Sequence, residues 1–331
     1  MNDTRGRLVT IFGASGFVGA VLVRTLAKRG WRVRAAVRRP DLAYHLQPLG
    51  GVGQVTAVQA NLRYPDSVAA ALRGADAAVN LVGIMNPRGR QTFEAVQAYG
   101  AEAVARCCAA AGVADLVHMS AIGADPQSDS DYARSKGEGE AAVRAAMPGA
   151  IVMRPSVVFG PGDDFFNRFG ALARFLPVLP VIGGDTKLQP VYVGDVAEAF
   201  ARALEGRARA GATYELGGAE IMTIRQIMDY VQKVTERRRP LLPMPEAGAR
   251  VVAKITDFVD RVSLGLMPGE LVTTPDQVKL LGRDNVVSAA AKAEGRTLEG
   301  LDIRPTLVEA IAPTYLYRFR KTGQFDRASA A

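Results

Sequence analysis

The sequence is short of the patterns that mark secreted, membrane-spanning and metal-binding proteins. Two cysteines occur among 331 residues, Cys107 and Cys108, adjacent in a stretch with helical periodicity. Adjacent side chains on a helix point in different directions, so we expect no disulfide, no metal site and a reducing compartment. No run reaches the roughly 18 apolar residues of a spanning helix. An apolar strand begins within about eight residues of Met1, which argues against a secretory signal.

The composition is that of a globular chain with a basic first part. Hydrophobic residues make up 48% and charged residues 22% of the chain, which excludes a disordered or fibrous protein. Residues 1–60 carry nine Arg or Lys against two Asp, most of the net charge of +8. This excess suits a phosphorylated cofactor or an anionic membrane surface, or is in part a solvated helix face. Nucleic acid is a poor partner, because no recognition-helix or base-stacking motif accompanies the basic residues.

A glycine-rich turn dominates the start of the sequence. The apolar run at residues 9–12 ends in Gly13, Gly16 and Gly19, and an amphipathic helical pattern follows. In a strand–turn–helix unit, these glycines would allow a positive φ, the approach of a pyrophosphate and close helix packing, respectively. The helix start would offer unpaired N–H groups to the phosphates. The predicted dinucleotide contacts here are Gly13, Ser15, Gly16, Phe17, Val18 and Gly19.

Alternating strand and helix patterns predict an α/β fold, a Rossmann-like doubly wound parallel sheet. The strands that follow the first are expected at residues 32–37, 55–59, 77–82 and 116–120. Arg38 and Arg39 end the second strand, where an acidic residue would favour NAD and two arginines suit a 2′-phosphate. We therefore expect NADP(H) in preference to NAD(H), the alternative being that both arginines are only surface loop residues.

Three further positions lie at ends of predicted strands, where the cofactor would pass. Asn61 and Leu62 follow the third strand, near the expected adenine. Gly83 follows the fourth strand, although a buried strand end with a turn glycine explains this residue nearly as well.

Candidate catalytic residues follow the fifth strand. Tyr132 and Lys136 are four residues apart and would share one helical face, and Ser120 ends the strand. A tyrosine can exchange a proton with a substrate oxygen when a cation stabilises its phenolate, and the lysine can also bind the nicotinamide ribose. Ser120 can hydrogen-bond the substrate oxygen. We expect all three residues to contact the cofactor as well, although Tyr and Lys at this spacing also occur on ordinary protein surfaces.

The chain resembles the extended or atypical short-chain dehydrogenases/reductases, an NAD-dependent epimerase/dehydratase-like group. The matching residues are Gly13, Gly16 and Gly19 of the first turn, Ser120, Tyr132 and Lys136 of the catalytic set, and the segments 154–163 and 189–197. The resemblance covers roughly residues 7–235 and implies that Pro155 and Val158 also contact the cofactor.

Four segments are similar to one branch of this group, which includes the nucleotide-binding accessory subunit of respiratory complex I (alpha-subcomplex subunit nine) and its bacterial relatives. They are residues 120–125, 132–136, 163–169 and 189–196. This implies an NADP(H)-binding structural or regulatory nucleotide carrier in quinone-linked respiration. Complex I subunits or a membrane surface are the implied partners. We interpret the chain as a bacterial relative, in the cytoplasm or peripheral on the inner face of the plasma membrane.

One departure from the active epimerases leaves enzymatic turnover open. The 12-residue step from Ser120 to Tyr132 is shorter than theirs, and their paired serines are absent. Cofactor binding is therefore better supported than catalysis. The alternative is an active NAD(P)H-dependent reductase or epimerase that acts on a quinone, isoprenoid or sugar-nucleotide substrate through Tyr132 and Lys136. A third interpretation is a redox-sensing module that changes partners with the state of the nucleotide.

The second half predicts a smaller α/β lobe. We assign residues 1–160 to the dinucleotide domain, with returning strands near 189–217, and residues 161–331 to an intertwined substrate or docking lobe with a mobile tail from about 318. Asp195 and Thr223 are the expected N-caps of two helices. The apolar stripe at 251–262, beside basic residues 237–239, predicts a helix that packs on the lobe or docks on a membrane or partner.

Overall fold

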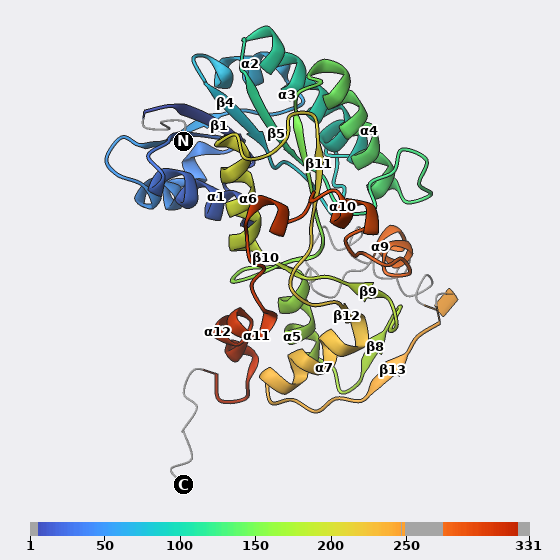
Figure 1. Ribbon diagram of the computed structural model, residues 1–331. Coiled ribbons are helices and arrows are strands. Elements are labelled where there is room, and N and C mark those ends of the chain that lie inside the picture. The colour runs from blue at the N-terminus through green and yellow to red at the C-terminus, as the bar shows by residue number, and fades with distance from the viewer. Residues whose placement is uncertain (1–5, 246, 249–273, 324–331) are drawn as a thin grey trace. The chain divides into compact units, whose positions relative to one another are not determined.

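The computed structural model describes residues 6–245, 247–248 and 274–323. These residues form two compact units (Figure 1). Unit 1 comprises the described residues of 1–155, 193–217 and 287–305, and unit 2 those of 156–192, 218–286 and 306–331.

Unit 1 is built on a seven-stranded parallel sheet with the order β11-β6-β5-β4-β1-β2-β3, which confirms the expected Rossmann-like fold. The strands are β1 (Leu8–Phe12), β2 (Arg32–Val37), β3 (Val55–Gln59), β4 (Ala77–Asn80), β5 (Asp115–Met119), β6 (Ile151–Pro155) and β11 (Thr213–Leu216). The strand order reverses between β1 and β4. In open parallel sheets, ligands bind outside the carboxyl ends of the strands at such a reversal.

Helices cover both faces of this sheet. They are α1 (Phe17–Lys28), α2 (Pro65–Leu72), the π-helix η3 (Glu94–Ala98), α3 (Tyr99–Ala110), α4 (Asp131–Ala146), α6 (Val193–Leu204) and α10 (Ala289–Ala293), with the 3₁₀ turns η1 (Pro40–Leu42), η2 (Tyr44–Leu49) and η5 (Glu299–Leu301). Helices α1 and α6 pack together on one face, and α2, α3 and α4 lie on the other (Figure 1).

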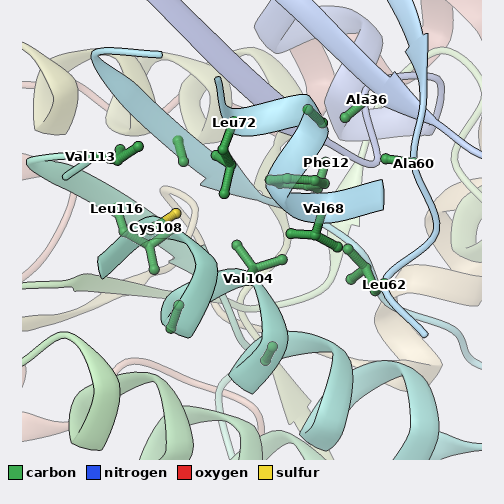
Figure 2. Packing of buried hydrophobic residues seen from close by; sticks show 14 of the residues in the cluster. Phe12, Ala36, Ala60, Leu62, Val68, Leu72, Val104, Cys108, Val113 and Leu116 are labelled. Atoms are coloured by element: carbon green, nitrogen blue, oxygen red, sulfur yellow. The ribbon is translucent and has the colours of Figure 1, made fainter. Parts of the chain in front are cut away.

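One buried apolar cluster of unit 1 lies between the sheet and the α2–α3 layer. Figure 2 shows Phe12 of β1 beside Val68 of α2, and Leu116 of β5 beside Cys108 of α3. Each of these side chains is at most 2% exposed. This apolar packing anchors β1 and β5, whose carboxyl ends carry the candidate site residues.

Unit 2 is assembled from short strands and helices around a second apolar cluster that includes Phe159, Phe166 and Ile227. Its elements are β7 (Val158–Phe159), α5 (Phe165–Phe175), β8 (Leu179–Val181), β9 (Lys187–Leu188), β10 (Val191–Tyr192), β12 (Met222–Thr223), α7 (Ile224–Val234), β13 (Leu241–Pro243), α9 (Pro275–Leu280), α11 (Val308–Ile311), α12 (Pro313–Leu316) and the 3₁₀ turn η6 (Tyr317–Phe319). The pairs β7–β10 and β8–β13 are parallel, and β9–β12 is antiparallel.

The unit boundaries differ from the division made from the sequence. Unit 1 ends its first segment at Pro155 and regains residues 287–305. The reason is long-range pairing: Glu215 N donates to Arg296 O (2.9 Å), and Arg296 Nη1 donates to Thr213 O (2.6 Å). Bonds between segments so far apart leave no local sequence signal.

The helix caps gave one correct and one wrong prediction. The Thr223 hydroxyl accepts from Gln226 N (3.1 Å) while Gln226 Oε1 accepts from Thr223 N (2.8 Å), a capping box that confirms Thr223 as an N-cap. Asp195 was wrong as an N-cap, because α6 begins at Val193 and places Asp195 inside the first turn.

The remaining lobe predictions fall partly outside the described residues. The apolar stripe at 251–262 lies there entirely. Two residues of the predicted mobile tail form hydrogen bonds. Phe319 O accepts from Arg237 Nε (2.7 Å), and Arg320 Nε donates to Val234 O (3.0 Å). The described helices include none long and apolar enough to cross a membrane.

Candidate functional site

The glycine turn after β1 has the geometry expected of a phosphate loop. Gly13 has φ +83°, and its carbonyl accepts from Gly16 N (3.1 Å). A Cβ at Gly19 would collide with the carbonyl oxygens of Gly13 and Ala14, so only glycine fits where α1 crosses the turn. Helix α1 begins at Phe17 with no side-chain cap and no acidic residue in its first turn. The first N–H groups of a helix have no intrahelical acceptor, and here no capping side chain replaces one, so this helix end fits a diphosphate.

The two arginines expected to select the 2′-phosphate differ in their surroundings. Both are exposed at the end of β2. Arg39 pairs with Asp41 (2.6 Å), and this guanidinium lowers the pKa of the Asp41 carboxyl. Arg38 has no side-chain partner among the described residues. An exposed ion pair is worth little, so Arg39 can exchange Asp41 for a ligand, but Arg38 is the arginine already available.

Asn61 and Leu62 have structural roles that need no ligand. Asn61 Oδ1 accepts from Arg63 N (3.2 Å), and Asn61 N donates to Ser67 Oγ (3.0 Å), which closes the turn before α2. Leu62 is buried in the core against Gly100. Their contact with a cofactor stays a prediction.

The three candidate catalytic residues lie in unit 1, on β5 and α4. Ser120 directly follows β5, is 1% exposed, and its hydroxyl has no hydrogen-bond partner in the described part of the chain. The Lys136 Nζ donates to Met119 O (3.2 Å), so the ammonium reaches the end of the same strand. Helix α4 is positioned by Ser130, whose hydroxyl accepts from Ala133 N (3.3 Å) as its N-cap.

Burial controls the protonation of Tyr132 and Lys136. The Tyr132 ring packs edge-on against Phe93 with centroids 5.9 Å apart. Burial raises the pKa of Tyr132 to about 12 and lowers the pKa of Lys136 to about 8. At neutral pH the phenol is protonated and the ammonium is charged. The protonated phenol can donate a proton to an oxygen.

Two residues that sequence reasoning missed flank Lys136. Glu140 lies one turn further along α4 and forms two 2.8 Å bonds with the guanidinium of Arg154, and its negative charge raises the pKa of Lys136 against the effect of burial. Gln97, on the π-helix η3, donates through Nε2 to Ile84 O (3.2 Å), and its Oε1 is buried without a partner in the described chain. The four-residue step from Lys136 is a signal that could have found Glu140.

Gly83 lies beside the side chains of both Lys136 and Gln97. A Cβ there would lie 3.2 Å from Lys136 Nζ and 3.7 Å from Gln97 Oε1. The glycine therefore leaves space beside two polar ends, which is a reason for its presence beyond a simple turn.

His118 adds another polar group without a partner. Asn80 Oδ1 accepts from Val82 N (3.1 Å), so Asn80 Nδ2 is the group that donates to His118 Nδ1 (3.2 Å). The proton of neutral His118 then lies on Nε2, which has no partner in the described residues. Burial lowers the pKa of His118 to about 3, helped by the charges of Lys136 and Arg144. Unpaired polar atoms near the ends of β4 and β5 fit a polar ligand better than an apolar core.

The two positions inferred from resemblance belong to different units. Pro155 ends β6 in unit 1, and its carbonyl accepts from Ile122 N (3.1 Å). Val158 is a partly buried residue of β7 in unit 2. A role of either residue in cofactor binding stays a prediction.

Residues 9–217 match the NAD dependent epimerase/dehydratase family. The chain belongs to this family. Its curated relatives include the mitochondrial NADH dehydrogenase (ubiquinone) 1 alpha subcomplex subunit 9 of Arabidopsis thaliana, 32% identical over 327 residues, 97% of this chain and 80% of the relative. They also include a ceramide reductase of Caulobacter vibrioides, 34% identical over 265 residues, 77% of this chain and 78% of the relative. These matches confirm the expected family and branch.

A solved member of the same fold is an NADPH-dependent quinone oxidoreductase from Escherichia coli in complex with NADPH. It has a TM-score of 0.69 and 20% identity, and the match covers 93% of this chain and 99% of that protein. At this identity the likeness concerns the fold alone.

Proposed function

We propose that this protein is an NADP(H)-binding, structural or regulatory nucleotide carrier in quinone-linked respiration, associated with complex I subunits and peripheral to the membrane. The observation that carries the nucleotide part is the start of α1, which has no side-chain cap and no acidic residue, follows the turn at Gly13 and packs on that turn through Gly19. The respiratory part is supported by relatives named as subunits of NADH dehydrogenase. The bound nicotinamide would supply hydride chemistry, and the chain's residues would hold and orient it.

The proposed preference for NADP(H) is attributed to Arg38. Its guanidinium lacks a carboxylate partner in the described residues, and a 2′-phosphate offers it a bidentate acceptor. Lys136 and Ser120 would hold the nicotinamide end, because the charged ammonium and the unpaired hydroxyl are both at the end of β5.

Thermal unfolding with added nucleotide tests the binding proposal. A ligand that binds only the folded protein stabilises it by about 2.7 kcal/mol at a concentration 100 times Kd, so NADPH should raise Tm more than NADH does. The variant Arg38→Gln should reduce the difference between the Tm shifts that NADPH and NADH produce. The matched control is Arg32→Gln, at the opposite end of β2, which should leave this difference unchanged. Equal melting with and without both nucleotides would refute nucleotide binding.

Isolation of the protein with its partners tests the respiratory part. Native purification from the source membranes should recover complex I subunits together with the chain. Recovery of the chain free of those subunits, in preparations that retain intact complex I, would reject the association.

A reductase is the second candidate, favoured by the protonated Tyr132 and by the buried, unpaired Ser120 hydroxyl. Tyr132→Phe keeps the ring and removes the proton. For a reductase, NADPH oxidation with quinone, isoprenoid or ceramide-type carbonyl substrates should fall in this variant while NADPH binding persists. A carrier should show no turnover in either protein.

A further inference from the structure

A cationic cluster in unit 2 borders an open cavity of about 740 Å³. The cavity lies at the carboxyl end of α7, and the chain that follows this helix forms much of its wall. The charged lining residues are Lys233, Arg237, Arg238 and Arg239, with Asp229 and Glu236. Cations therefore outnumber carboxylates in the wall, and the cavity attracts anions.

Main-chain hydrogen bonds fix two of these guanidinium groups. Arg237 Nε donates to Phe319 O (2.7 Å), and Arg239 Nε donates to Ala173 O (3.2 Å). A guanidinium has five N–H donors, so each bond leaves most of them for another acceptor. Neither arginine has a carboxylate partner among the residues that the structure describes. Two anchored guanidinium groups suit the oxygens of a phosphate, which they bind in a bidentate manner.

The positive charges of Arg174, Arg237 and Arg239 lie close enough to repel one another. Burial, together with the charges of Arg239 and Arg174, lowers the pKa of Arg237. The nearby carboxylate of Glu236 is engaged by Arg320 (3.3 Å). The cluster therefore carries repulsion that a bound anion would relieve.

Exposed apolar side chains accompany these charges. Phe175, which ends α5 two residues after Ala173, is 66% exposed, and the Arg174 guanidinium lies 5.5 Å from its ring centre. Leu242 in β13 is 57% exposed. A free phosphate ion gains nothing from apolar neighbours, whereas a bilayer surface accommodates basic heads together with aromatic and aliphatic side chains.

We propose that the cluster Arg174, Lys233, Arg237, Arg238 and Arg239 binds the phosphate groups of anionic phospholipids at a bilayer surface. This inference rests on the peripheral location in the proposed function and assigns it a binding site. It concerns unit 2, and it does not depend on whether the glycine turn of unit 1 holds a nucleotide.

Vesicle flotation of the full chain tests the inference. The protein should float with phosphatidylcholine vesicles that contain phosphatidylglycerol and not with phosphatidylcholine alone. Each basic residue near an anionic surface contributes about 1 kcal/mol, so Lys233→Gln with Arg238→Gln should weaken binding about 30-fold. Neither side chain has a hydrogen bond or ion pair in the described structure, so this variant should fold. The matched control is Lys28→Gln with Arg24→Gln, two exposed residues of α1, which should bind as the wild type does.

Three results would overturn the lipid site. The first is equal flotation of the wild type with both vesicle types, and the second is a loss of vesicle binding in the matched control equal to that in the cluster variant. The third is binding of inorganic phosphate to this cavity without flotation of the protein. Melting of the wild-type protein with NADPH separates this proposal from the nucleotide proposal. A wild-type protein that floats with phosphatidylglycerol vesicles but shows no Tm shift with NADPH would refute only the nucleotide proposal, and one that shows the Tm shift but does not float would refute only the lipid site.

Discussion

Replacement of the buried Lys136 by methionine tests the idea that the candidate site lowers the stability of the protein. Lys136 is 4% exposed, and burial lowers the pKa of its ammonium to about 8. At about 1.4 kcal/mol per pKa unit, the buried charge costs on the order of 3 kcal/mol at neutral pH. Methionine has a similar length without the charge, but the variant loses the bond to Met119 O, worth about 1 kcal/mol. We expect Lys136→Met to be more stable by about 2 kcal/mol.

The pH dependence separates the removal of charge from better packing. The pKa of Lys136 is lower in the folded state than in the unfolded chain, so the unfolded chain binds more protons between about pH 8 and pH 10. The free energy of unfolding of the wild type therefore rises relative to that of the variant between about pH 8 and pH 10, where the folded-state lysine becomes neutral. The cost of the charge is fully present below about pH 8 and has largely disappeared by about pH 10.

Thermal unfolding followed by circular dichroism measures this difference. For a unit of this size the variant should melt about 4–8 °C above the wild type at about pH 7, and its advantage should shrink by about pH 10. Lys28→Met, at an exposed position of α1, is the control and should leave Tm nearly unchanged. A variant that melts at or below the wild type at neutral pH, or that keeps its full advantage at high pH, would refute the reasoning.

Three further substitutions, two in unit 1 and one in unit 2, test other contacts by unfolding in urea. Glu140→Gln should cost about 3 kcal/mol, because it breaks a buried pair with the Arg154 guanidinium. Gly19→Ala should cost about 1–3 kcal/mol and reduce the NADPH-induced Tm shift, because its Cβ would displace the turn before α1. Tyr315→Phe should cost about 1.5–3 kcal/mol, because the Tyr315 hydroxyl donates a 2.6 Å bond to the buried Asp163 carboxyl.

Matched controls make these expectations specific. Glu102→Gln removes a carboxylate from an exposed pair with Arg106 and should cost under about 0.5 kcal/mol. Gly149→Ala adds a Cβ where no atom lies within 4 Å and should be nearly neutral. If the Glu140, Gly19 and Tyr315 variants cost no more than such controls, the contacts assigned to them do not carry the stability inferred here.

Features with a local cause were predictable from the sequence. The strands at residues 32–37 and 55–59 have the expected bounds, because the apolar pattern of a strand is a property of a short segment. The glycine turn was predictable for the same reason, since a positive φ and close backbone contact exclude side chains. The position of Ser120 directly after β5 was predictable because a strand end is recognisable in the sequence.

Features that depend on distant contacts were not predictable in this way. The π-helix Glu94–Ala98 places Gln97 in the site, and the periodicity of the sequence does not indicate the extra residue in that turn. The Glu140–Arg154 pair joins α4 to β6, and neither residue type indicates a buried partner. Residues 287–305 return to unit 1 through backbone bonds that any sequence can form.

The polar groups beside β4 and β5 are more consistent with binding than with structural support. A buried hydroxyl, amide oxygen or ring N–H without a partner costs about 1–3 kcal/mol, and Ser120, Gln97 and His118 each contribute one in the described chain. Apolar residues of similar volume would avoid this cost, as the Phe12–Leu116 cluster does nearby. A fold that keeps such atoms beside a charged, buried Lys136 retains them at the expense of its own stability. A polar ligand at the strand ends would satisfy these atoms, and a purely structural role for the unit would not.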